Sequence, residues 1–268
     1  SNLSTMFTAV NQQTSEIAAQ VGQTPQGWNS SIFSMIRNIS DSVVIPIAGI
    51  IITLILCYEL ISMLTERNNL HDVDTWMFFK WIFKTACAVL IVTNTWNIVM
   101  GVFEAAQSVV NSASGIIISD TSLTFNEHIA GFEAKLLEME VWSLLGLWLE
   151  SVVVHLSMWA LTICIFIICY GRMIEIYLVT SIAPIPMATM MGKEWGGMGQ
   201  NYLRSLLALA FQGFLIIICI AIYAVLVQNM LIDDNISTAI WLCMGYTVLL
   251  CFTLFKTSSL AKSIFNSH

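Results

Sequence analysis

The chain has 268 residues, of which 57% are hydrophobic and 10% charged, and its formal net charge is −7. A soluble domain usually carries about 25% charged residues, so this composition argues against a soluble enzyme or binding module and indicates residence in a membrane. The acidic balance also argues against a broad basic surface that would hold nucleic acid.

Long apolar runs divide the chain into predicted membrane spans. About 20 apolar residues in a helix cross a hydrocarbon core of about 30 Å, and several runs reach that length with almost no charge. We expect an all-α polytopic membrane domain over residues 43–255, between a polar N-terminal segment with an amphipathic helix (1–42) and a short tail (256–268). The expected spans are 43–64, 79–103, 141–171, 203–230 and 237–255, with a long connection at 104–140 and a proline-broken element at 174–191.

The distribution of lysine and arginine indicates how the proline-broken element crosses the membrane, because these residues are enriched on the cytoplasmic side. If the element spans the membrane, six of the ten basic residues lie outside. If it enters and returns to the same side, only Arg37 and Lys135 lie outside. We therefore expect five spans plus a re-entrant or half-membrane element, with the N-terminus and the 104–140 connection outside and the C-terminus cytoplasmic. Six full spans are the alternative.

Residues 177–214 contain the least regular apolar segment, which Pro184 and Pro186 interrupt. Proline removes a backbone donor and clashes with the preceding helical turn, and inside a membrane the freed backbone must be satisfied by protein or water. This favours a channel lining or a subunit contact, although a simple kink stays open. The glycine-rich loop that follows lacks the Gly-Lys-Ser/Thr ending of a phosphate-binding loop and is predicted to be a turn. Further candidate residues in this loop are Glu194, Trp195, Gly196 and Gly197.

Two pairs of ionisable residues lie inside or beside the predicted spans. Arg172 and Glu175 are three residues apart and share a helix face, so they either form an interfacial ion pair or contact the re-entrant loop or a partner subunit. For Glu150 and His155 two interpretations stay open. Either the Glu150 carboxylate faces the membrane interface and the His155 imidazole is hydrogen-bonded inside the bundle, or both belong to a proton or substrate path. Ionisable groups within a membrane often mark such paths.

Catalytic and metal-binding patterns are missing from the sequence. No nucleophile is spaced with a base, and the seven cysteines lack the paired spacing of a zinc site. His71, Asp72 and Asp74 share a loop with Glu66, where we expect solvated side chains rather than a metal ion. We therefore expect no enzymatic activity, no cofactor and no metal.

From Arg172 to Gln228 the sequence carries IAPIPMAT, the Glu194-Trp195-Gly196 turn, NYLR and ALAFQGF. This stretch resembles the TrbL-type polytopic subunit of type IV secretion and conjugation machines, in the form carried by Gram-positive mobile elements. Over 43–260 the resemblance rests on the layout of the spans, and the first 40 residues add nothing to it.

The resemblance implies a homo-oligomeric ring in the cytoplasmic membrane, surrounded by lipid, that works beside ATPases and other type IV secretion subunits. The implied substrate is relaxase-bound single-stranded DNA or protein. A small-solute transporter or channel that uses the broken helix and Glu150 is the alternative. Transporters often have two related halves with matching breaks, whereas a single broken run is found here.

Overall fold

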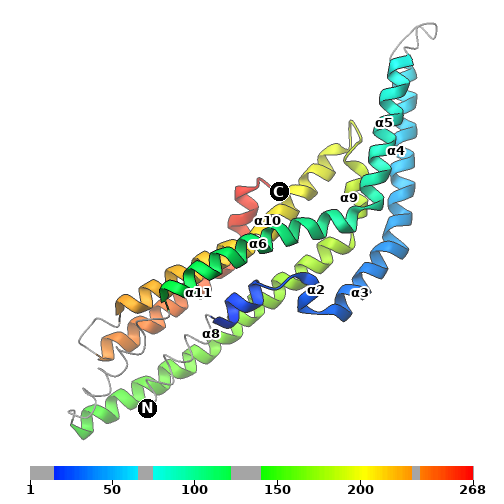
Figure 1. Cartoon of the computed structure of the whole chain (residues 1–268). Helices are drawn as coiled ribbons and strands as arrows, with labels where there is room; N and C mark the ends of the chain where they lie inside the picture. Colours follow the sequence, from blue (N-terminus) through cyan, green and yellow to red (C-terminus); the bar gives the residue numbers. More distant parts are fainter. Residues whose placement is uncertain (1–14, 66–74, 122–139, 231–235, 268) are drawn as a thin grey trace. The chain divides into compact units, whose positions relative to one another are not determined.

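The computed structural model describes residues 15–65, 75–121, 140–230 and 236–267, and all regular secondary structure in these ranges is helical (Figure 1). Residues 15–21 are helical. The helices that follow are α2 (Pro25–Trp28), α3 (Ser30–Ile39), the π-helix η1 (Ser40–Val44), α4 (Ile45–Thr65), α5 (Thr75–Thr93), α6 (Thr95–Thr121), α8 (Val141–Ser181), α9 (Pro184–Thr189), α10 (Gly196–Met230) and α11 (Ile236–Ile264).

Five helical segments of the described chain are long and apolar enough to cross a membrane. Large apolar side chains are exposed along them, with Phe83 exposed by 71% and Leu54 by 65%, as expected where lipid rather than water surrounds a helix. The prediction of an all-α polytopic membrane protein is confirmed. The five segments are Ser30–Thr65, Thr75–Thr93, Val141–Ser181, Gly196–Val227 and Ser237–Ile264.

The apolar runs at 141–171 and 174–191 are not separate helices. Helix α8 continues without a break to Ser181, because no proline or glycine interrupts residues 172–181. The chain turns at 182–183, and Pro184 then begins the six-residue helix α9, where the fixed backbone angle of proline suits a first helical position. The described residues thus contain no sixth helix at 174–191 that could span a membrane.

The expected second span at 79–103 is divided between α5 and α6, which meet at Asn94. Thr93, Asn94 and Thr95 each donate a side-chain hydrogen bond to a backbone carbonyl one turn earlier, at 2.9 Å. Such bonds compete with the regular helical ladder and bend helices, and Figure 1 shows the chain change direction there. Helix α6 then extends to Thr121, into the expected connection at 104–140, and residues 122–139 of that connection lie outside the described residues.

The chain divides into two compact units. The first comprises Ser1–Gln23, Ala106–Arg172 and Phe211–Ala261, and the second comprises Thr24–Ala105, Met173–Ala210 and Lys262–His268. Helices α6, α8, α10 and α11 therefore each contribute to both units.

The first unit has an apolar core from four long helices, represented by Val110 of α6, Val154 of α8, Ile216 of α10 and Ile240 of α11. Polar side chains also join these helices. The hydroxyls of Tyr223 and Thr247 share a hydrogen bond of 2.7 Å between α10 and α11. Polar contacts between apolar helices align them where lipid provides no hydrophobic driving force between helices.

The second unit contains the α4–α5 pair, which runs side by side in Figure 1, and the short helix α9 packed against both. Their common core includes Ile52, Leu56, Ala88 and Ala188. The apolar face of α3 packs on the protein itself, since Phe33 is buried against Trp96 and Tyr177. The π-helix η1 joins α3 directly to α4, so the amphipathic helix and the first span form one continuous helical segment.

Helices α9 and α10 approach each other so closely that only glycine fits at one contact. A Cβ atom on Gly199 would lie 2.6 Å from the Pro186 carbonyl oxygen and 2.8 Å from the Met190 Cα atom. Both obstacles are backbone atoms, which cannot move aside as a flexible side chain can. Gly197, two residues earlier, has no neighbour within 4 Å of an added Cβ.

We predict that Gly199→Ala lowers the free energy of unfolding by about 1–3 kcal/mol, the usual cost of overpacking a tight contact. Gly197→Ala, the matched control, leaves it unchanged or raises it by up to about 1 kcal/mol, since alanine is the better helix former. Thermal unfolding of both variants in the same detergent measures the difference, and equal midpoints would contradict the close packing of α9 on α10.

Candidate functional site

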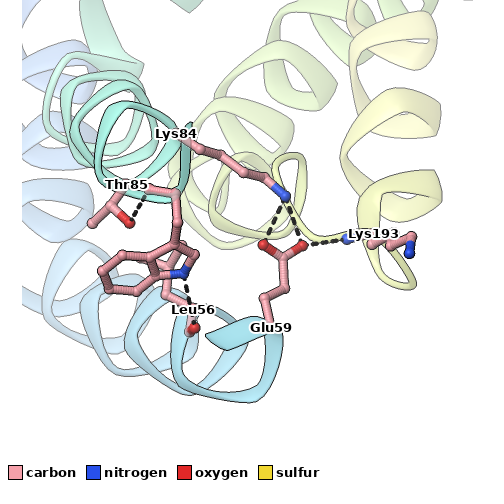
Figure 2. Close-up of polar contacts among 6 residues, drawn as sticks. Leu56, Glu59, Lys84, Thr85 and Lys193 are labelled. Atoms are coloured by element: carbon pink, nitrogen blue, oxygen red, sulfur yellow. Dashed lines mark hydrogen bonds and ion pairs between the residues drawn. The ribbon is translucent and has the colours of Figure 1, made fainter. Parts of the chain in front are cut away.

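The carboxylate of Glu59 joins three segments of the second unit (Figure 2). It projects from the last third of α4 and is buried, with 9% of the residue exposed. The ammonium of Lys84, from α5, donates to both carboxylate oxygens at 2.7 Å. The backbone N–H of Lys193, in the loop after α9, donates to Oε1 at 2.7 Å. A buried carboxylate is tolerated when it is paired and hydrogen-bonded in this way.

This cluster was not among the residues singled out in the sequence, although a signal for it exists. Glu59 lies near the end of the first apolar run and Lys84 near the start of the next one. Two antiparallel spans joined by a loop bring such positions to the same depth in the membrane. A carboxylate late in one span and a lysine early in the next are therefore candidates for pairing. The Lys193 backbone contact has no comparable signal, because it comes from a distant loop.

A pocket of about 400 Å³ adjoins the Glu59 cluster. Three lysines and two glutamates line it, which leaves a surplus of one positive charge. Glu59 has its oxygens occupied by donors, so the pocket offers charge for binding rather than a free carboxylate base. The lining residues are Ile55, Tyr58, Glu59, Ser62 and Met63 of α4, Lys80, Trp81 and Lys84 of α5, and Gly192, Lys193, Glu194 and Trp195 of the loop.

The glycine-rich loop takes part in this site and forms a turn at residues 193–195. Glu194 accepts a hydrogen bond from the Tyr58 hydroxyl at 3.2 Å, and Trp195 is 54% exposed. A Cβ atom on Gly196 would lie 3.1 Å from the Met190 carbonyl oxygen, so this glycine allows the turn to close tightly. Gly197 has no such constraint.

Pro184 and Pro186 are both buried in α9, the helix that packs against α4 and α5 of the same chain. The local backbone remains bonded: the Met187 N–H donates to the Ala183 carbonyl at 3.2 Å, and the Thr189 hydroxyl donates to the Pro186 carbonyl at 2.7 Å. The break in the apolar run is thus satisfied by protein, as the bilayer requires.

Arg172 and Glu175 have different surroundings. Arg172 is buried, and its guanidinium lies so close to Gly213 of α10 that an added Cβ would come within 2.8 Å of a terminal nitrogen. Glu175 accepts from the Lys262 ammonium of α11 at 3.2 Å, with the two side chains 38% and 46% exposed. The two residues of α8 therefore lie against two different helices, α10 and α11.

Glu150 and His155 also lie in different surroundings. The Ser237 hydroxyl donates to Glu150 at 2.7 Å, which ties the N-terminal part of α8 to the start of α11. His155 is exposed on α8, beside the exposed Leu156. The placement of the His155 imidazole inside the bundle stays a prediction, since this side chain is exposed in the single chain that the structure describes.

No group of three or more histidine, cysteine, aspartate or glutamate side chains within the described ranges could hold a metal ion. The loop that carries His71, Asp72 and Asp74 lies outside the described residues. None of the seven cysteines forms a disulfide, and Cys169, Cys243 and Cys251 are buried.

We predict that Lys84→Met lowers the free energy of unfolding by about 3–5 kcal/mol, because it leaves a buried carboxylate without its counter-charge. Adding Glu59→Gln to that variant removes the unpaired charge and restores much of the loss. Thermal unfolding of the two single variants and the double variant forms the cycle that measures this coupling.

Lys262→Met is the matched control, since it breaks the exposed pair with Glu175. A partly exposed pair contributes about 0–1 kcal/mol, so this variant unfolds nearly as the parent does. If Lys84→Met and Lys262→Met were equally mild, the Glu59 cluster would not be a structural anchor.

Residues 10–184 match a protein family described as TrbL/VirB6 plasmid conjugal transfer like protein. No curated protein and no solved structure matches the chain. The match begins within the first 40 residues, which added nothing to the resemblance seen in the sequence. Of the stretch that suggested the family, residues 172–228, the match includes only residues 172–184. A match over most of the chain, together with five apolar helices that could cross a membrane, shows that this chain belongs to the TrbL/VirB6 family of conjugal transfer proteins.

Proposed function

We propose that this protein is a channel or scaffold subunit that helps to translocate relaxase-bound single-stranded DNA or protein across the cytoplasmic membrane. The family match over residues 10–184 carries the proposal, since it makes the chain a membrane subunit of a conjugal transfer system. The protein acts without catalysis of its own, as a homo-oligomeric ring that works with the ATPases and other subunits of the machine.

The subunit lies in the membrane with its N-terminus outside and its C-terminus in the cytoplasm. The composition of the pocket supports this orientation. The five-span arrangement requires Lys193 on the same side as Lys80 and Lys84, and all three line one pocket. The backbone bond from Lys193 to Glu59 likewise favours a loop after α9 that lies on the side of the membrane where α4 ends.

The loop after α9 is the proposed contact with a neighbouring subunit or with the channel wall. Trp195 in this loop and Gly197 in the first turn of α10 are exposed, whereas Pro184 and Pro186 are buried and hold the loop in position through α9.

We predict that deletion of the gene from its mobile element reduces transfer to recipient cells to background, and that the intact gene supplied in trans restores it. Crosslinking during transfer followed by capture of the protein should recover the transferred strand. Unchanged transfer after deletion contradicts the proposal, and solute flux through liposomes that hold the protein alone would favour a small-solute channel.

The orientation is tested with single cysteines at Lys193 and Asp234 in a background without the seven native cysteines. A membrane-impermeant thiol reagent added to intact cells should label Asp234→Cys and should label Lys193→Cys only after the membrane is opened. Labelling of Lys193→Cys from outside would refute the five-span orientation.

A further inference from the structure

The pocket beside Glu59 has the composition of a site for an anionic lipid headgroup. Lys84 is engaged with Glu59 in an ion pair of 2.7 Å. The remaining charges are the ammonium groups of Lys80 and Lys193 and the carboxylate of Glu194, which already accepts from Tyr58. The pocket therefore has more positive charge than its own carboxylates neutralise, and a monoanionic phosphate would balance it.

The aromatic side chains around the pocket indicate its depth in the membrane. Tyr58, Trp81 and Trp195 line it, and tyrosine and tryptophan concentrate where the bilayer meets water. Lys80 lies one turn from the start of α5, with its ammonium 5.7 Å from the centre of the Trp76 ring. Both spans thus reach the level of the lipid headgroups at the pocket.

The surroundings favour a lipid over a soluble anion. Next to the lining residues in the chain are Ile61, Phe79 and Phe83, which are exposed by 60%, 61% and 71%. Phe79 and Phe83 each precede a pocket lysine in the chain, and their exposed rings offer an apolar surface for acyl chains on the same helix. A volume of about 400 Å³ falls within the range of small-molecule pockets, roughly 300–1,000 Å³, and is suited to a phosphoglycerol group rather than to a nucleic-acid strand.

We propose that this pocket binds the phosphate of an anionic phospholipid, with Lys80 and Lys193 as the binding cations and Trp81 beside the glycerol. The bound lipid bridges α5 and the loop after α9, and thereby adds to the connection that Glu59 makes between them. The inference rests on membrane residence and not on the transfer role, so a failed transfer assay leaves it standing and a failed lipid assay leaves the proposed function standing.

Native mass spectrometry of the purified full chain tests the proposal by titration with phosphatidylglycerol and phosphatidylcholine. Phosphatidylglycerol should bind more tightly. Lys80→Gln with Lys193→Gln should weaken its binding roughly thirtyfold, since each lysine beside an anionic lipid surface contributes about fivefold in affinity. Glu194→Gln, which removes a negative charge and keeps an oxygen for the Tyr58 bond, should strengthen binding roughly fivefold.

The charge-matched control is Arg204→Gln with Lys256→Gln, two exposed residues that do not line the pocket; it should bind phosphatidylglycerol as the parent does. Opposite effects of the lysine and Glu194 variants support an electrostatic site, because damage to the fold would weaken binding in both. The proposal is overturned if the lysine variant binds as the parent, if phosphatidylcholine binds equally well, or if inorganic phosphate or a short single-stranded oligonucleotide displaces the lipid.

Discussion

A carboxylate buried near the end of a membrane helix has to be neutralised by other parts of the chain, and in this protein that requirement falls on Glu59. Its oxygens have donors from α5 and from the loop after α9. Leaving the buried Glu59 carboxylate unpaired would cost several kcal/mol of folding free energy, about 3–5 kcal/mol in known cases. The register of α4 against α5 and the position of the loop are therefore linked, since both are needed to bring donors to this carboxylate. The pocket exists because these three segments meet there.

The proline-broken element satisfies a second requirement of the bilayer, that backbone groups outside a regular helix be bonded within protein. Helix α9 meets it by packing against α4 and α5, with Thr189 capping a freed carbonyl. The close contact at Gly199 then starts α10 directly beside α9. Irregular backbone here has a structural explanation within one chain, which leaves the exposed loop as the part open to neighbours.

These features suit a subunit of a transfer machine whose work depends on assembly. A scaffold has to hold its loops at a defined depth while it is surrounded by lipid. Charged groups at the ends of spans do this, since they resist entry into the hydrocarbon core and attract anionic lipid. The proposed lipid site would make the position of the loop depend on the membrane as well as on the protein.

The sequence by itself determined the class of this protein, because apolar runs of span length in a chain with 10% charged residues permit few other arrangements. It also predicted the break at Pro184, and the prolines and glycines that suggested the family lie where the chain turns. These predictions succeeded because each depends on a local pattern: the length of an apolar run, or the position of a proline or glycine. The continuity of α8 through residues 171–181 was missed, because the charged Arg172 beside Gly171 looks like a span end, although neither residue stops the helix. Tertiary structure alone decided that Glu175 pairs with Lys262 and that Glu59 accepts from the Lys193 backbone. Those choices depend on which distant segments reach the same depth in the membrane, and no periodicity within one segment contains that information.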